Sequence, residues 1–174
     1  MHMLTANKLG ALGVLIGDLT RDTVGELSPT AAAILLTLHH HGDATATTLA
    51  AIAGISQPTA VRVCGGLIDR GLVVHGERVG KAAPLRLTEA GTARTLALQS
   101  ARLAALDRLL APLKDAERDQ LARLLDGMLA GATASRRFAR TTCRLCDHAL
   151  CDGPACPVGT RAAAIERAER NREG

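Results

Sequence analysis

The chain has 174 residues, of which 47% are apolar and 22% charged, so it suits one compact domain, or a domain with a small appendage, and is not disordered throughout. Its 21 Lys and Arg against 17 Asp and Glu give a net charge of +4, an excess that permits a nucleic-acid partner without requiring one. Only 1% of the residues are aromatic, which excludes proteins that bind single strands by stacking bases on aromatic side chains.

No apolar run approaches the roughly 20 residues that a bilayer span needs. The most apolar stretch lies near the start of the chain, where Lys8, Asp18 and Arg21 interrupt it. We therefore expect a cytoplasmic protein that does not interact with a membrane.

The first half of the chain predicts three helices in succession. Leucines recur at near-helical spacing over residues 4–24, which indicates an amphipathic helix. Ser28 as N-cap and Pro29 at the first helical position begin a second helix, which Gly42 ends. A short third helix is expected over residues 49–53.

A fourth helix is expected from Ser56 to Arg70, with Ser56 as its N-cap. Helical spacing places Ala60, Val61, Cys64, Leu67 and Ile68 on a packed face and Thr59, Arg62, Val63 and Gly66 on the opposite, presented face. Two short helices joined by a glycine-containing turn, the second with an exposed polar face, are typical of a helix-turn-helix.

Two strands, residues 72–75 and 85–88, form a hairpin after this unit, which makes it a winged helix-turn-helix. Long helices are then expected over residues 88–112 and 114–135. Their leucine stripes are too extensive for one small domain to cover, so they imply a partner helix. The predicted fold class is mainly α with a small β-wing.

Five segments carry a resemblance to a known family. They are Leu27-Ser28-Pro29-Thr30, Thr48-Leu49-Ala50, Ile55-Ser56-Gln57-Pro58-Thr59, Leu67-Ile68-Asp69-Arg70-Gly71-Leu72-Val73 and Leu87-Thr88-Glu89-Ala90-Gly91. In this order and spacing, residues 4–135 resemble the MarR family of winged-helix repressors. The resemblance implies a homodimer, with residues 1–27 and 89–135 as a helical dimerisation domain and residues 28–88 as the DNA-binding domain.

Double-stranded DNA is the partner that this resemblance implies. The fourth helix would enter the major groove, and a two-fold dimer would place two such helices on a palindrome about one helical turn apart. Gln57 can pair with an adenine edge, Arg62 with guanine or phosphate, and Thr59 with a thymine methyl or phosphate. Ser56 serves mainly as the cap. By the family's pattern the wing tip reaches the minor groove, with the candidates Arg78 and Lys81, although Glu77-Arg78-Val79-Gly80-Lys81 departs from the family's usual acidic-arginine wing motif.

Four of the five cysteines fall within 14 consecutive residues of a separate C-terminal module, residues 136–174, which ends in a helix over residues 160–172. Because we expect no signal peptide, the cluster Cys143, Cys146, Cys151 and Cys156 indicates metal coordination rather than disulfides. We favour an iron–sulfur centre, because only one pair has the Cys-x2-Cys spacing and Pro157 follows the last cysteine; zinc is the alternative.

Residues around the cluster have secondary roles in this interpretation. The basic flank would offset the negative charge of four thiolates; its members are Arg136, Arg137, Arg140 and Arg144. His148 is expected to support a ligand rather than to be one. The run His39-His40-His41 points in three directions on a helix, so no single metal site is expected there. Cys64 is expected to be a small core residue.

Three functions follow from these patterns. The first is a homodimeric repressor of a palindromic operator, in which the cysteine centre senses redox or iron status. The second is a repressor with a structural zinc site that responds to a small acidic or phenolic effector, bound between the dimer and winged domains, as the resemblance implies. The third, an electron carrier or thiol enzyme, has no support from a catalytic motif, so we expect no enzymatic activity.

Overall fold

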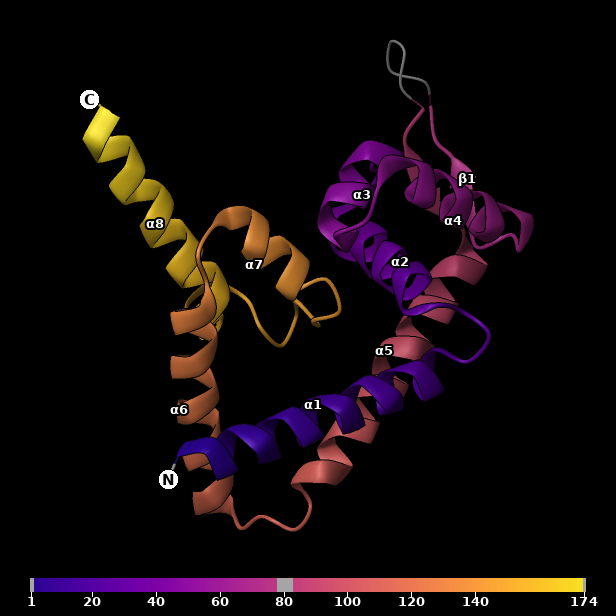
Figure 1. Cartoon of the computed structure of the whole chain (residues 1–174). Helices are drawn as coiled ribbons and strands as arrows, with labels where there is room; N and C mark the ends of the chain where they lie inside the picture. Colours follow the sequence, from indigo (N-terminus) through magenta and orange to yellow (C-terminus); the bar gives the residue numbers. More distant parts are fainter. Residues whose placement is uncertain (1, 78–82, 174) are drawn as a thin grey trace.

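A computed structural model describes residues 2–77 and 83–173 of the chain. The described part is mainly helical with one small antiparallel sheet, and this confirms the predicted fold class (Figure 1). No helix in it combines the length and the hydrophobicity of a membrane span. In chain order the elements are α1 (His2–Val24), α2 (Pro29–His41), α3 (Ala46–Ala53), α4 (Gln57–Asp69), β1 (Val73–His75), β2 (Leu85–Leu87), α5 (Glu89–Leu110), α6 (Asp115–Ala132), α7 (Arg136–Thr142), the 3-10 helix η1 (Gly153–Ala155) and α8 (Pro157–Glu173).

Side-chain caps set where the helices of the winged unit begin. The Ser28 hydroxyl accepts a hydrogen bond from the Ala31 amide at the start of α2, as expected. Thr45 caps α3 in the same way, by accepting from the Thr48 amide, so α3 begins three residues earlier than the predicted Leu49. Gly54 then ends α3 at a positive φ of 70°, which a residue without Cβ adopts easily.

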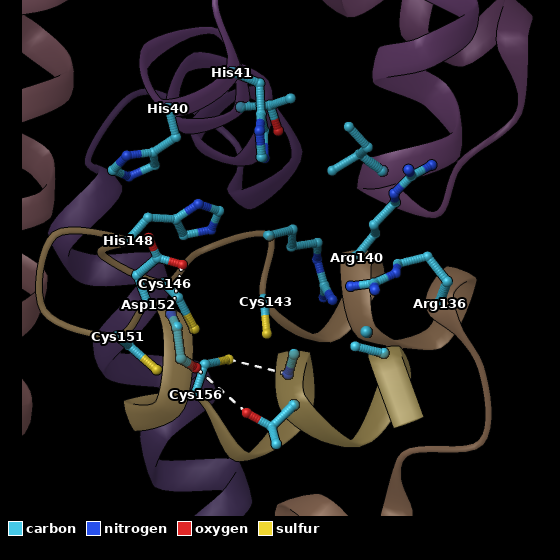
Figure 2. Close-up of a pocket in the computed structure, with 18 of the residues that line it drawn as sticks. His40, His41, Arg136, Arg140, Cys143, Cys146, His148, Cys151, Asp152 and Cys156 are labelled. Carbon is cyan, nitrogen blue, oxygen red and sulfur yellow. Dashed lines mark hydrogen bonds between the residues drawn. The ribbon is translucent and has the colours of Figure 1, made fainter. Parts of the chain in front are cut away.

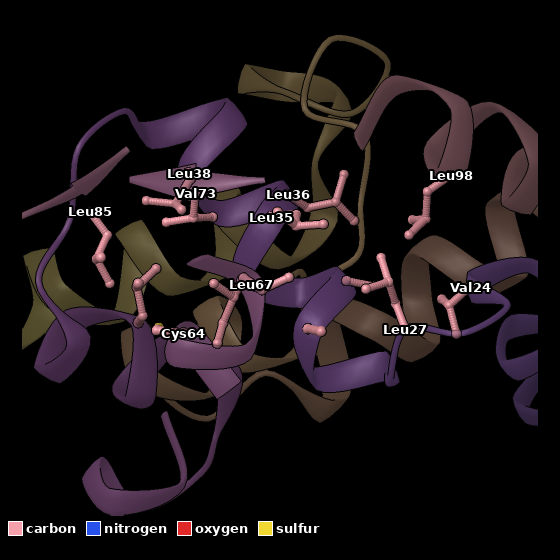
Figure 3. Packing of buried hydrophobic residues seen from close by; sticks show 14 residues of the cluster. Val24, Leu27, Leu35, Leu36, Leu38, Cys64, Leu67, Val73, Leu85 and Leu98 are labelled. Carbon is pink, nitrogen blue, oxygen red and sulfur yellow. The ribbon is translucent and has the colours of Figure 1, made fainter. Parts of the chain in front are cut away.

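The hydrophobic core of the winged unit is built around α2. Residues 31–38 of this helix are all buried, because α3, α4, α5 and β2 surround it. Leu67 of α4, Val73 of β1 and Leu98 of α5 pack with it in one cluster (Figure 3). The sheet pairs Val73 with Leu87 and His75 with Leu85. The core therefore fixes α4 and the hairpin relative to each other.

The long helices α1, α5 and α6 extend away from this core (Figure 1). Helix α1 packs along α5, but none of the residues of α6 is buried, and α6 packs mainly against α8. Large apolar side chains remain exposed on α1 and α6; they include Leu4, Leu9, Leu12, Leu15, Leu124, Leu125, Met128 and Leu129. The apolar stripes expected from the sequence thus lie on the surface of the isolated chain.

The C-terminal module has a small core of its own. Ala139 of α7 packs with Val158 and Ala162 of α8, and Cys143 and Cys156 lie against them. Helix α7 was not predicted; its cap is Ser135, which accepts from the Phe138 amide. Helix α8 begins at Pro157 rather than Thr160, because proline suits the first helical position.

Candidate functional site

The first candidate site is the solvent-facing side of α4. Gln57 and Arg62 are both exposed there, as expected for residues that contact a partner. The face assignment was wrong for two valines: Val61 is 55% exposed, whereas Val63 is half-buried against the core. Val61 lies beside Arg62 and is therefore an apolar member of the presented face that the sequence analysis missed.

The hydroxyl groups of Ser56 and Thr59 at the start of α4 form the hydrogen bonds of the helix cap. Ser56 Oγ accepts from the Thr59 amide at 3.4 Å and lies 2.8 Å from Thr59 Oγ1. Both hydroxyls therefore hydrogen-bond locally, and Thr59 is half-buried. Gln57 and Arg62 are the polar side chains of this face best placed to reach outward.

The hairpin lies next to α4 in sequence and shares its core (Figure 1). Both of its strands are three residues long, and Ala44 before α3 adds a bridge to Leu85, with N to O distances of 3.1 and 2.8 Å. Arg86 on β2 is exposed and was not among the predicted contact residues. The predicted wing-tip residues Arg78 and Lys81 lie outside the described residues.

The second candidate site is a cavity of about 700 Å³ where α2 and α3 of the winged unit face the C-terminal module. Figure 2 shows the sulfur atoms of its four cysteines gathered on one side of this cavity. The cysteines are Cys143, Cys146, Cys151 and Cys156. Residues 13 positions apart in sequence thus share one space, as their clustering predicts.

Hydrogen bonds join the four thiols in two pairs, Cys143 with Cys146 and Cys151 with Cys156, and charge interactions link the two pairs. A hydrogen bond from the Cys143 thiol lowers the pKa of Cys146 to about 7, and the same bond raises the pKa of Cys143. Burial, followed by the negative charge of Cys156, raises the pKa of Cys151 to about 11. The cavity therefore favours some thiolates and opposes having all four together, unless a cation compensates their charge.

The donor set fits a thiolate-bound metal chemically. The Gly159 amide donates to Cys156 Sγ at 3.1 Å, because Cys156 precedes the first turn of α8, where amide groups point toward an anion. As they stand, however, no three Cys, His, Asp or Glu side chains within residues 2–77 and 83–173 are close enough to hold a metal ion. Binding would require the two thiol pairs to draw together.

A cation that acts on Cys146 comes from α5, which is distant in sequence. Arg102 of α5 donates from Nη1 to the Leu145 carbonyl at 3.0 Å, and its positive charge is one of the causes that lower the pKa of Cys146. Arg136, a member of the basic flank that was expected to offset thiolate charge, instead forms an ion pair with Glu166 through two hydrogen bonds of 2.8 and 3.0 Å. Sequence patterns could not indicate Arg102, because it lies 43 residues before Leu145 and no motif surrounds it in α5.

Histidines form the wall of the cavity opposite the thiols (Figure 2). The ring of His148 stacks on His40, with centroids 4.4 Å apart, and meets His41 edge-on at 5.1 Å. Burial, and then the charge of His148, lowers the pKa of both His40 and His41, which favours neutral rings. Two members of the histidine run therefore converge on the cysteine loop, a packing contact that helical spacing alone did not predict.

Comparisons with known proteins find relatives of the winged unit. The model of the MarR family matches residues 26–82, the span from before α2 to the hairpin. None of the curated proteins compared with the chain matches it. The match covers the part of the chain that carries the helix-turn-helix, and not the cysteine module.

Solved structures with the same fold include three bacterial proteins. A MarR family protein from Bacillus stearothermophilus is 21% identical, with a TM-score of 0.66 over 77% of this chain and 99% of that chain. A probable transcriptional regulator from Pseudomonas aeruginosa is 26% identical, with a TM-score of 0.56 over 69% and 92%. MepR, a transcription regulator of the Staphylococcus aureus multidrug efflux pump MepA, is 16% identical, with a TM-score of 0.60 over 70% and 95%.

Proposed function

We propose that this chain, which matches the MarR family over residues 26–82 and has the fold of MarR winged-helix regulators, is a homodimeric transcriptional repressor that binds a palindromic DNA operator. The observation that carries the proposal is the exposed face of α4, held beside the hairpin by a shared core. A helix of this width fits the major groove of B-DNA. In this proposal the exposed Gln57 and Arg62 contact base edges or phosphates, and the exposed Arg86 contacts the DNA backbone.

The proposed dimer rests on the exposed apolar residues of α1 and α6. A helix such as α6, with no buried residue and a row of exposed leucines, would gain stability if a partner covered that row. Pairing of two chains through α1 and α6 would bury both rows. The two-fold axis would then present two copies of α4 to one face of a duplex.

Selection of bound duplexes from a random-sequence pool by the full-length protein tests this part of the proposal. We expect an enriched palindrome whose half-sites lie about one helical turn, roughly 34–36 Å, apart. Substitution of Gln57 by Ala should relax the preference at one position in each half-site. A pool that gains no preferred sequence would contradict the proposal.

We further propose that the four cysteines hold a metal centre, an iron–sulfur cluster that reports redox or iron status. Four thiols share one cavity, their neighbours raise the pKa of Cys143 and Cys151, and an amide donor is directed at Cys156, so a bound cation would relieve the conflict of negative charge. Iron–sulfur clusters and zinc both accept four thiolates, and the single Cys-x2-Cys pair favours the cluster. Regulators of this family are in general non-enzymatic, and we propose no catalytic activity.

Colour and metal content distinguish the two centres. The chain has no Trp and no Tyr, so absorbance bands of a bound cluster are easily seen. Brown protein from anaerobic purification, containing iron and sulfide, is the expected result. Colourless protein with one zinc per chain would support the alternative, and protein that retains neither metal and takes up neither on reconstitution would contradict both.

The second candidate function is a repressor that responds to a small acidic effector while a zinc ion only stabilises the module. The cavity favours it, because Arg140, Arg144 and Arg167 line its wall together with apolar residues of α2 and α3. This cavity adjoins the C-terminal module rather than the expected cleft between the dimer and winged domains. Release of DNA by an aromatic carboxylate such as benzoate, with the metal content unchanged, would favour this function over redox sensing.

A further inference from the structure

We propose that Arg102 of α5 is the positioning residue that ties the cysteine centre to the winged-helix unit, so that filling or emptying the centre changes the affinity for DNA. This inference rests on the proposed function, in which the cysteines hold a metal and the chain binds an operator. It assigns the link between the two sites to one side chain.

Arg102 joins two parts of the chain that are far apart in sequence. Its Nη1 atom donates to the carbonyl oxygen of Leu145, the residue directly before Cys146. The Leu145 side chain itself packs against the main hydrophobic core. The guanidinium group is partly buried, and its Nε has no hydrogen-bond partner among the described residues. The cysteine loop is thus held to α5 by a guanidinium group that still has a hydrogen-bond donor without a partner among the described residues.

The charge of this cation makes the contact sensitive to the state of the cysteines. Four thiolates around Zn²⁺ or an iron–sulfur cluster carry a net negative charge, which attracts a nearby guanidinium. Because loading must draw the two thiol pairs together, it also displaces Cys146 and the adjoining Leu145 carbonyl that Arg102 holds. The partly buried position of Arg102 strengthens the difference, because water screens charges less there than at the surface.

Helix α5 carries this difference to the DNA-binding elements. It begins directly after β2, and its cap residue Thr88 donates to the Gly71 carbonyl at 2.7 Å, just beyond α4. One turn later Gly91 lies against the Leu72 carbonyl so closely that a Cβ there would come within 1.9 Å of the oxygen. A shift of α5 must therefore move the junction between α4 and β1.

A second contact between the module and the winged unit provides a competing route. Thr141 of α7 lies so near Gly54, between α3 and α4, that a Cβ on Gly54 would come within 2.9 Å of the threonine methyl. Coupling through this contact would not need Arg102. The two routes therefore predict different results when Arg102 is replaced.

The test compares the operator affinity of full-length protein with a filled and with an empty centre. Arg102→Met removes the charge and keeps the length of the side chain, Arg102→Lys restores the charge, and Arg108→Met is the control, since Arg108 is an exposed arginine of the same helix. Proteins are reconstituted anaerobically with ferrous iron and sulfide, or loaded with Zn²⁺, and metal content is measured for each. For the wild type, we expect the operator Kd with a filled centre to differ at least about fivefold from the Kd with an empty centre. For Arg102→Met, we expect the same two Kd values to differ less than about twofold.

Arg102→Lys is expected to recover a large part of the difference, and Arg108→Met all of it. An Arg102→Met protein that loads its metal and still responds as wild type overturns the inference and favours the route through Thr141. One that folds but takes up no metal also overturns it, because the arginine would then build the centre rather than transmit its state. If the Arg102→Met protein does not fold, Arg102→Gln is tested instead, and its results are interpreted in the same way. A wild-type protein whose Kd does not depend on the metal overturns the proposed sensing itself, and this inference with it.

Discussion

Arg62 shows what a single exposed side chain contributes to the proposed interface. It is exposed in the middle of α4 and makes no hydrogen bond or ion pair within the described part of the chain, so its replacement should leave the fold unchanged. We expect Arg62→Ala to weaken operator binding by about 1–3 kcal/mol if the arginine contacts a base, and to lower the salt dependence by about one counterion if it contacts a phosphate.

Anisotropy titrations of a labelled operator at several salt concentrations measure both quantities for Arg62→Ala. Arg108→Ala, on α5, removes the same charge away from α4 and serves as the control. Equal affinity and equal salt dependence of the two variants would contradict a DNA contact by Arg62.

Cys64 differs from the other four cysteines because it is buried among the core residues of α4. Burial raises the pKa of its thiol, which keeps the thiol protonated and unreactive. We therefore expect Cys64→Ala to retain the metal centre and its response to oxidant, at a cost of about 1 kcal/mol of stability from the small cavity. Metal analysis and chemical denaturation measure these effects. Loss of the metal in this variant would place Cys64 in the centre.

At the scale of elements, the sequence predicts best where caps and periodicity act locally. Ser28 and Ser56 cap the helices that they were expected to cap, and the hairpin lies where the two apolar segments predicted it. Predictions that needed tertiary contacts failed or were absent. Val61 was assigned to the packed face, since spacing alone cannot tell which edge of an apolar stripe the core covers, and no local pattern distinguished Arg102 from the other arginines of the long helices.

The junction of α5 with the winged unit depends on Gly91. A Cβ at this position would lie 1.9 Å from the Leu72 carbonyl oxygen, far closer than Cβ atoms approach other atoms in proteins, so α5 would have to move. We expect Gly91→Ala to lower the free energy of unfolding by about 2–4 kcal/mol, as overpacked core sites do. Gly65→Ala in α4 is the control, because nothing lies within 4 Å of its Cβ position, and should stabilise the helix by about 0.5–1 kcal/mol. Urea denaturation measures both free energies of unfolding, and similar values would contradict a close contact between Gly91 and the Leu72 carbonyl.

At the scale of the whole molecule, the exposed rows on α1 and α6 are the surface that the proposed dimer would cover. Leu125 and Met128 of α6 are 43% and 49% exposed, and neither belongs to the two hydrophobic cores. We expect Leu125→Glu with Met128→Glu to convert a dimer into monomers by placing two like charges from each chain in one apolar interface. Sedimentation velocity measures the change in mass.

The same double variant should bind a palindromic operator far more weakly, because each monomer then contacts only one half-site and the gain from linking two contacts is lost. Its affinity for a single half-site should be unchanged, since α4 lies in a separate core. Leu96→Glu is the control: Leu96 is 52% exposed on α5, outside the two rows and outside the cysteine loop. A double variant that remains dimeric, or a wild-type chain that is monomeric and still binds the full palindrome with high affinity, would contradict the proposed arrangement of two recognition helices across a two-fold axis.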